Sequence, residues 1–365
     1  MKTTYLLLCL LGIGSVSGAG QTKQPQKIGD FIESTSYNEH RRNATRSLQY
    51  TPDGDDFVCI NGKNRFTRAL YGSHTAFRLE TSDRPVFAAY TKENPKHICF
   101  KLQTSGGTVA LDSTEHCESR YTAGRRSYSL SDPAFGGGSL SITTWALPDK
   151  EGAIWQFNAR NFKEFHPVLL ASISEIRNSK LNRNGDMGAD PADSFEAPLQ
   201  PQQLQSFPVQ IDGTLYILLE NQELRTLTTA EGENLFKKAE AARSETASRI
   251  RIETPDPYFN TLGGTLAMAA DGIWDGEVWL HGAIGWRMPL SGWRAAYTGD
   301  VLGWHDRART HFNAYAASQV TEVPNTFPHP AQDSALHLAR SVKKWGTPQY
   351  SNGYICRNPH RNNQM

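Results

Sequence analysis

"SLSITTWALPDKEGAIWQFNARN", residues 139 to 161, contains two short runs of alternating character separated by a connection with proline and glycine. In the first run, Leu140, Ile142, Thr144 and Ala146 recur at every second position. Alternation of this kind places those side chains on one face of a strand, which predicts a strand buried on that face. The segment therefore predicts a β-rich fold.

The same pattern extends from about Ile28 to Leu227. Its further runs are "FVCING" (57–62), "PVFAAY" (85–90), "HICFKLQ" (97–103), "GTVAL" (107–111) and "TLYILLE" (214–220). Many short strands at close intervals are typical of an antiparallel β-sandwich. We therefore expect a sandwich domain over residues 21–227, in which the polar segment 174–203 forms a long loop. Glycine-rich "AFGGGSL" (134–140) precedes a strand, which favours a hairpin connection over a phosphate-binding loop.

A helical period replaces the alternation after residue 227. Thr228 and Glu231 have the spacing of a capping box, which predicts the start of a linker helix within residues 228–257. Further helices are predicted over residues 258–271, 299–320 and 330–342. Val301, His305, Ala308 and Phe312 share one predicted face of the second of these helices, which we expect to be its buried face.

The N-terminus predicts export. "MKTTYLLLCLLGIGSVSGAGQ" combines an early lysine, an apolar run and small residues where a signal peptidase cleaves, so residues 1–20 are interpreted as a signal peptide. The apolar run is shorter than the roughly 20 residues of a spanning helix. We expect a periplasmic or extracellular protein with no membrane contact after cleavage.

Charge and cysteine usage exclude several classes of protein. A formal net charge of +1 argues against a nucleic-acid partner, which would require a basic surface. Cys59, Cys99, Cys117 and Cys356 are too widely spaced for a metal knuckle. Two of the first three could form a disulfide, or all could be buried free thiols. No nucleophile elbow, P-loop or zinc-protease helix occurs, and we expect no cofactor and no metal.

The segment "DGIWDGEVWLHGAIGWRMPLSGWRAAYTGDVLGWHD", residues 271–306, contains five of the eight tryptophans of the chain. Indole rings stack on the apolar faces of sugars, and charged groups among them bind hydroxyls, so the segment predicts a carbohydrate cleft. The alternative is a rigid aromatic core in which arginines stack on the rings. The predicted substrate-binding residues are Trp286, Arg287, Trp293, Arg294, Trp304 and His305.

Asp300 is the predicted catalytic residue. It follows Thr298 and Gly299 at the expected start of the helix over 299–320, where the helix dipole stabilises a carboxylate. A group held in this way suits a base or a hydroxyl acceptor better than an acid, and its alternative role is that of a plain helix cap. Other candidate carboxylates are Asp271, Asp275, Glu277 and Asp306. Glycoside hydrolysis needs two carboxyl groups roughly 5 to 9.5 Å apart.

Residues 260–276 and 282–312, "NTLGGTLAMAADGIWDG" and "GAIGWRMPLSGWRAAYTGDVLGWHDRARTHF", resemble the opening of the catalytic barrel in six-hairpin glycosidases. They look most like an uncharacterised family of large exported bacterial proteins in that superfamily. The resemblance implies an α+β chain: an N-terminal antiparallel β-sandwich, a linker helix, and the first hairpins of an (α/α)6 barrel over residues 258–365. "YTGD" (297–300) matches part of a sugar-binding turn in related α-L-rhamnosidases, whereas the carboxylate-rich run before that turn is missing.

These observations predict an exported glycoside hydrolase, or the N-terminal part of one, acting on plant-type or host polysaccharide. Polar residues follow "GYI" (353–355) with no further helix, so we expect the chain to be the front of a longer protein. The first alternative is a polysaccharide lyase, for which Tyr297 and His305 are candidate bases. The second is a glycan-binding protein without catalytic activity.

Overall fold

The structure is a computed structural model. It describes residues 50–63, 68–72, 77–91, 95–162, 166–176, 204–279 and 296–317. All of these belong to one of the two units into which the chain divides, residues 48–365. The predicted signal peptide over residues 1–20 and the predicted helix over residues 330–342 lie outside the described residues.

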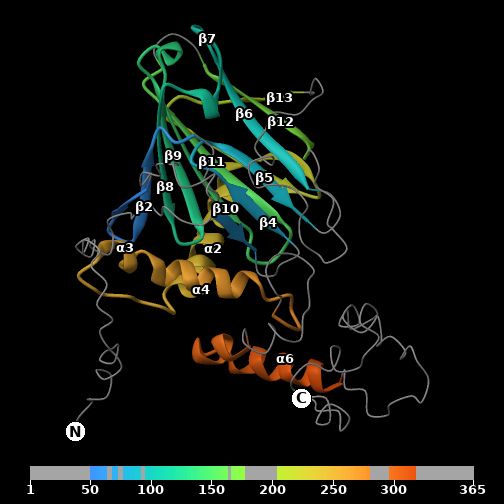
Figure 1. Cartoon of the computed structure of the whole chain (residues 1–365). Coiled ribbons are helices and arrows are strands. Elements are labelled where there is room, and N and C mark those ends of the chain that lie inside the picture. Colours follow the sequence, from blue (N-terminus) through green and yellow to red (C-terminus); the bar gives the residue numbers. More distant parts are fainter. Residues whose placement is uncertain are drawn as a thin grey trace, which may run out of the picture. The chain divides into compact units, whose positions relative to one another are not determined.

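The described strands form two antiparallel sheets (Figure 1). The eight-stranded sheet has the order β1 (Thr51–Asp53), β2 (Asp56–Ile60), β8 (His116–Thr122), β9 (Arg125–Ser131), β10 (Ser139–Ala146), β11 (Gly152–Arg160), β14 (Thr214–Glu220) and β15 (Glu223–Leu227). The seven-stranded sheet has the order β13 (Gln205–Pro208), β12 (Val168–Glu175), β6 (Lys96–Thr104), β5 (Val86–Tyr90), β4 (Arg78–Thr81) and β3 (Arg68–Tyr71), with β7 (Gly107–Ala110) paired to β6. The predicted α+β class with antiparallel sheets is confirmed.

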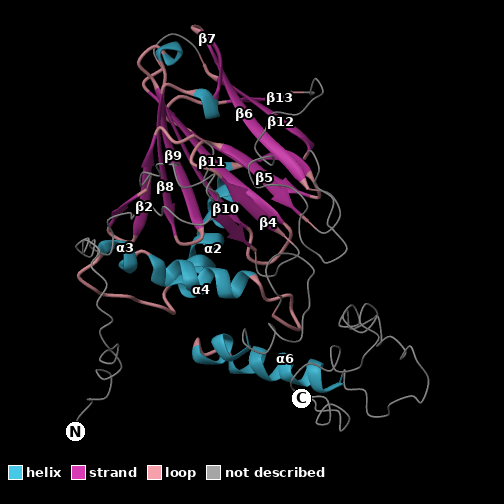
Figure 2. Ribbon diagram, in the orientation of Figure 1, coloured by secondary structure: helices cyan, strands magenta, loops and turns pink. Residues whose placement is uncertain are grey.

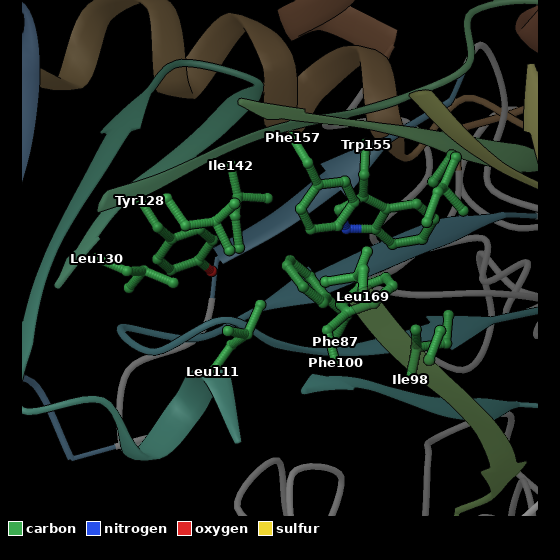
Figure 3. Close-up of a cluster of buried hydrophobic side chains, with 14 of the residues drawn as sticks. Phe87, Ile98, Phe100, Leu111, Tyr128, Leu130, Ile142, Trp155, Phe157 and Leu169 are labelled. Atoms are coloured by element: carbon green, nitrogen blue, oxygen red, sulfur yellow. The ribbon is translucent and has the colours of Figure 1, made fainter. Parts of the chain in front are cut away.

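Aromatic rings from both sheets form the core between them (Figure 3). The Phe87 ring of β5 meets the Trp155 ring of β11 edge-on, with ring centroids 5.4 Å apart. Phe100 of β6 meets Phe157 of β11 in the same way at 5.1 Å. Edge-to-face pairs of this kind add to the stabilisation that comes from burying the rings. The two sheets therefore pack face to face as a β-sandwich.

The segment over residues 139–161 forms two paired antiparallel strands, β10 and β11. Leu140, Ile142 and Ala146 of β10 belong to the sandwich core, as their alternation predicted. On the opposite face of β10, Trp145 is buried as well, because its ring contacts helix α2 (Thr229–Ala247), with its centroid 3.9 Å from that of Phe236. The linker helix therefore covers the outer face of this sheet at β10, β11, β14 and β15.

Helix α2 begins as predicted. The Thr228 hydroxyl accepts a hydrogen bond from the Glu231 main-chain N–H at 3.3 Å, and the Glu231 carboxylate accepts one from the Thr228 N–H at 3.0 Å. This capping box satisfies N–H groups that the first helical turn leaves unpaired. One turn of α2 lies directly on β14, where a Cβ at Gly232 would be 2.2 Å from the Tyr216 ring.

Two short 3-10 helices, Leu111–Ser113 and Pro133–Phe135, lie within the sandwich, and the remaining described α-helices follow α2 (Figure 2). They are α3 (Pro257–Asn260), α4 (Leu262–Gly272), a helical segment over residues 296–301, and α6 (His305–Ala317). Helix α4 contacts α2 and β3, and Gly272 lies so close to Tyr71 that a Cβ would be 2.1 Å from the ring. No helix in the described part of the chain is both long enough and apolar enough to span a membrane.

Candidate functional site

Three of the residues predicted to bind or act on a sugar are described, and they lie together. Asp300, Trp304 and His305 flank the turn between the helical segment 296–301 and helix α6. Trp286, Arg287, Trp293 and Arg294 lie outside the described residues. The site is therefore built here from the turn and from the helices that hold it.

The turn is a helix C-cap centred on Gly303, which has a φ of +82°. The Trp304 N–H donates to the carbonyl of Gly299 at 2.9 Å, and the Gly303 N–H donates to the carbonyl of Asp300 at 2.9 Å. This pair of bonds is the Schellman arrangement, which requires a left-handed residue after the helix end. The prediction of one helix over residues 299–320 is therefore wrong, because Gly303 ends one helix and α6 begins at His305.

This correction changes the environment of Asp300. Asp300 lies in the last turn of the first helix and not at a helix N-terminus, so the dipole argument made from the sequence does not apply to it. Its carboxylate contacts a side chain instead: Oδ1 is 2.6 Å from Nδ1 of His305. The two side chains are 55% and 69% exposed, so the pair is open to a ligand.

The Asp300–His305 pair leaves one imidazole nitrogen available. A carboxylate accepts hydrogen bonds, so Nδ1 of His305 is assigned as the donor. The imidazole is then oriented by Asp300, and Nε2 is the atom that can exchange a proton with a bound molecule. An aspartate that orients a histidine in this way is a recurring arrangement in proton-transfer sites.

Trp304 is in a different environment from the one predicted. Only 8% of it is exposed, and it belongs to a hydrophobic cluster with Trp274 and Trp279. Two guanidinium groups lie over its ring, those of Arg307 at 4.7 Å and Arg249 at 5.1 Å from the centroid. Its ring therefore packs against protein and offers little surface for stacking on a sugar.

Trp279 connects three helical segments and has no exposed surface. Its main-chain N–H donates to Nδ1 of His311 in α6 at 2.9 Å, and its indole N–H donates to the carbonyl of Ala270 in α4 at 3.0 Å. Its ring lies against Gly299 of the third segment. Trp274, Trp279 and Trp304 thus pack into the aromatic core that the sequence offered as the alternative to a cleft.

The other candidate carboxylates near the turn have structural partners. Asp271 forms a 2.6 Å ion pair with Arg307, which joins α4 to α6. Burial raises the pKa of Asp271, and the Arg307 pair opposes that shift. Asp275 Oδ1 accepts main-chain hydrogen bonds from Glu277 at 3.0 Å and Val278 at 2.7 Å, which closes a tight turn. These contacts assign Asp271 and Asp275 a role in holding the helices and loops.

Two apolar side chains beside Asp300 are exposed. Tyr297 is 57% exposed and Val301 is 87% exposed, both on the segment that carries Asp300. The Tyr297 ring also lies 5.9 Å from the ring of Phe312. The prediction that Val301 and His305 belong to a buried stripe is wrong, because the helix break turns both side chains outward. Tyr297 is therefore the described aromatic ring with open surface at this site.

Arg249 is a member of the site that the sequence analysis did not identify. It follows the end of α2, and its Nη1 donates to the carbonyl of Leu302 within the turn at 2.9 Å. No periodicity or motif marks this residue, since it acts on a main-chain oxygen 53 positions away. The sequence placed it only within the predicted linker helix over residues 228–257, whereas α2 ends at Ala247 and leaves Arg249 just beyond the helix.

The cysteines contribute no bridge to the described structure. Cys59, Cys99 and Cys117 are free thiols, which decides between the two alternatives for these three residues. Burial raises the pKa of Cys117 to about 12, so its reactive thiolate form is disfavoured. Within the described ranges, no three His, Cys, Asp or Glu side chains converge in a way that could hold a metal ion.

Part of the chain matches the model of a known protein family. Residues 95–249 match the model of a family described as a domain of unknown function (DUF4450). The matched part runs from the start of β6 to Arg249 and includes the linker helix. No curated protein matches the chain. The similarity thus covers much of the sandwich and ends at the residue that contacts the Asp300–His305 turn.

Proposed function

We propose that this protein is an exported carbohydrate-active protein that acts as a glycoside hydrolase on plant-type or host polysaccharide. The observation that carries the proposal is the exposed Asp300–His305 pair, with Oδ1 and Nδ1 2.6 Å apart. The pair follows directly in sequence on the segment with Trp286, Arg287, Trp293 and Arg294, the residue types that bind sugars. Exposed Tyr297 adds an aromatic surface beside it.

In this proposal Asp300 is the carboxylate that activates water or accepts a sugar hydroxyl, and His305 holds it in place. Hydrolysis also needs a proton donor for the leaving group. Asp271 and Asp275 are poor candidates for that donor, because the first is paired with Arg307 and the second closes a turn. The donor is therefore to be sought outside these two residues.

The domain and localisation predictions remain part of the proposal. The α4 helix, the segment over 296–301 and α6 would be the first helices of an (α/α)6 barrel over residues 258–365, joined to the sandwich by α2. Cleavage near residue 20 would release the protein to the periplasm or the medium. N-terminal sequencing of the exported protein tests cleavage, and an intact N-terminus would contradict it.

The activity test is release of reducing ends from a panel of plant and host polysaccharides. Removal of a catalytic base costs about 10² to 10⁴ in rate, so Asp300→Asn should lose at least that much of any activity found. Asp306→Asn is the matched control, because Asp306 is exposed on the same helix as His305 and contacts Arg309 across an exposed 3.3 Å pair. Equal losses in both variants would contradict the role of Asp300.

A polysaccharide lyase is the second candidate function, and the orientation of His305 favours it. Nε2 of an imidazole held by a carboxylate can remove a proton from the carbon next to a uronate carboxyl group. A lyase produces unsaturated uronates that absorb ultraviolet light, whereas hydrolysis produces none. Reducing ends without that absorbance support the hydrolase. Saturable glycan binding without any product would identify a binding protein instead.

A further inference from the structure

Arg249 holds the turn between Asp300 and His305 by two separate contacts. Its Nη1 donates to the main-chain carbonyl of Leu302 at 2.9 Å. Its guanidinium lies over the Trp304 ring, 5.1 Å from the centroid. Leu302 and Trp304 are the neighbours of Gly303, and a Cβ at Gly303 would lie 3.5 Å from the same Nη1 atom. The side chain therefore packs along the whole turn.

The hydrogen bond to Leu302 has a specific structural effect. Carbonyl groups in the last turn of a helix have no partner within the helix. The bonds from Trp304 and Gly303 satisfy the carbonyls of Gly299 and Asp300, and Arg249 satisfies that of Leu302. Arg249 thus fixes a part of the turn that the Schellman bonds do not reach.

We propose that Arg249 is a positioning residue that sets the geometry of the Asp300–His305 pair. Through Arg249, the C-terminal end of the linker helix α2 would contribute to the site. This inference rests on the proposed function of that pair. Arg249 touches neither Asp300 nor a substrate in this scheme. It acts through the main chain between Asp300 and His305. A shift of the Leu302 carbonyl would move the turn over residues 300–305 and with it both side chains of the pair.

A plain scaffold role is the competing explanation. Arg307 also lies over Trp304, at 4.7 Å, and its pair with Asp271 ties α6 to α4 without Arg249. If the arginine stack only stabilised the fold, loss of Arg249 would lower the melting temperature and leave the surviving folded protein fully active. If Arg249 positions the pair, the folded protein itself is less active.

The test uses the full chain with Arg249→Met, Arg249→Lys and Arg249→Ala. Hydrogen exchange of the peptide covering residues 299–305 should rise in Arg249→Met by about tenfold, which corresponds to about 1.4 kcal/mol and is of the size expected from loss of one hydrogen bond. Lysine keeps one donor for the Leu302 carbonyl, so Arg249→Lys should restore part of the protection. Unchanged exchange in this peptide overturns the proposal whether or not any glycan is cleaved.

Turnover gives the second readout. In folded Arg249→Met, kcat should fall by about tenfold to a hundredfold, with a smaller change in KM, because misplacement of a catalytic group by an ångström costs that much. Ethylguanidinium should restore part of the activity of Arg249→Ala, and ethylammonium should restore less. Arg251→Met is the control, since Arg251 is 86% exposed and pairs only loosely with Glu253 at 3.7 Å.

The two proposals fail in different ways. If exchange at residues 299–305 is faster in Arg249→Met and the wild-type chain cleaves no glycan, the hydrolase proposal is refuted, whereas the role of Arg249 in fixing the turn is supported. Normal exchange with a measurable wild-type activity would refute the positioning role and leave the hydrolase intact. A melting temperature lowered equally by Arg249→Met and Arg251→Met, with kcat unchanged in both, also overturns the positioning role.

Discussion

The indole of Trp279 lies directly on Gly299, so that a Cβ at position 299 would be 2.1 Å from the far edge of the ring. The ring has no exposed surface and cannot move outward. Its indole N–H is also bonded to the carbonyl of Ala270 at 3.0 Å. The helix that carries Asp300 can therefore pack this closely against Trp279 only because residue 299 has no side chain.

We expect Gly299→Ala to destabilise the chain by about 1 to 3 kcal/mol, because an extra methyl group in a packed core forces neighbouring atoms apart. Urea unfolding of the purified chain measures this loss. The double variant Gly299→Ala with Trp279→Phe should be less destabilised than the sum of the two single changes, since the smaller ring makes room. Simple additivity would show that the two residues do not interact.

Gly303 supports a second prediction, which concerns the backbone. Its φ of +82° costs an ordinary residue about 1 to 2 kcal/mol. Gly303→Ala should therefore lower the free energy of unfolding by that amount. Asparagine tolerates the left-handed region better, so Gly303→Asn should cost less. Equal costs for the two variants in urea unfolding would contradict this account of the turn.

Local patterns in the sequence predicted the elements that depend on local interactions. Leu140, Ile142 and Ala146 revealed a buried strand face because a strand alternates its side chains. Thr228 and Glu231 revealed the start of α2 because their capping bonds span three residues. Each of these signals depends only on neighbouring positions, so it is visible in the sequence alone.

The turn at Gly303 was missed because two signals conflicted. The spacing of Val301, His305 and Ala308 continues a helical period across it, whereas a glycine at that point marks a helix end. The structure follows the glycine. The contact of Arg249 with the Leu302 carbonyl could not be predicted from the sequence. Every residue has a main-chain carbonyl, so the residue type at position 302 does not indicate that this one is bound by an arginine.

Acid should weaken the contact between α2 and the sandwich through Glu240. Its carboxylate accepts from the Trp145 indole N–H at 2.8 Å and pairs with Arg243 at 2.6 Å. Burial alone would raise the pKa of Glu240. The pKa is nevertheless below its usual 4.5, because the carboxylate accepts hydrogen bonds from Arg243 and Trp145 and lies near the positive charges of Arg243 and Arg125. A lowered pKa in the folded state means that this stability is present above pH 4.5 and is lost as the pH falls through the folded value.

Glu240→Gln tests that dependence, because it keeps the shape and removes the charge. We expect the variant to lose about 1.5 to 3 kcal/mol near neutral pH, the value of hydrogen bonds to a charged group. In acid the variant and the wild type should converge, since the wild-type carboxylate is then protonated. Urea unfolding at both pH values measures the difference. A gap that does not shrink as the pH falls below 4.5 would contradict the role of the charge.

Tyr297 and Trp304 should respond in opposite ways to substitution, because their rings have different surroundings. Tyr297 is 57% exposed beside Asp300, whereas Trp304 is 8% exposed beneath two guanidinium groups. Tyr297→Ala should weaken glycan binding by up to about tenfold, with little effect on unfolding, since a stacked ring contributes about 0.5 to 1.5 kcal/mol. Trp304→Ala should cost about 3 to 5 kcal/mol of stability, as buried aromatic truncations do.

Val301→Ala is the control on the same helix as Tyr297, because this side chain is 87% exposed and has no ring. Glycan titrations of Tyr297→Ala and Val301→Ala that give equal affinities would remove Tyr297 from the site.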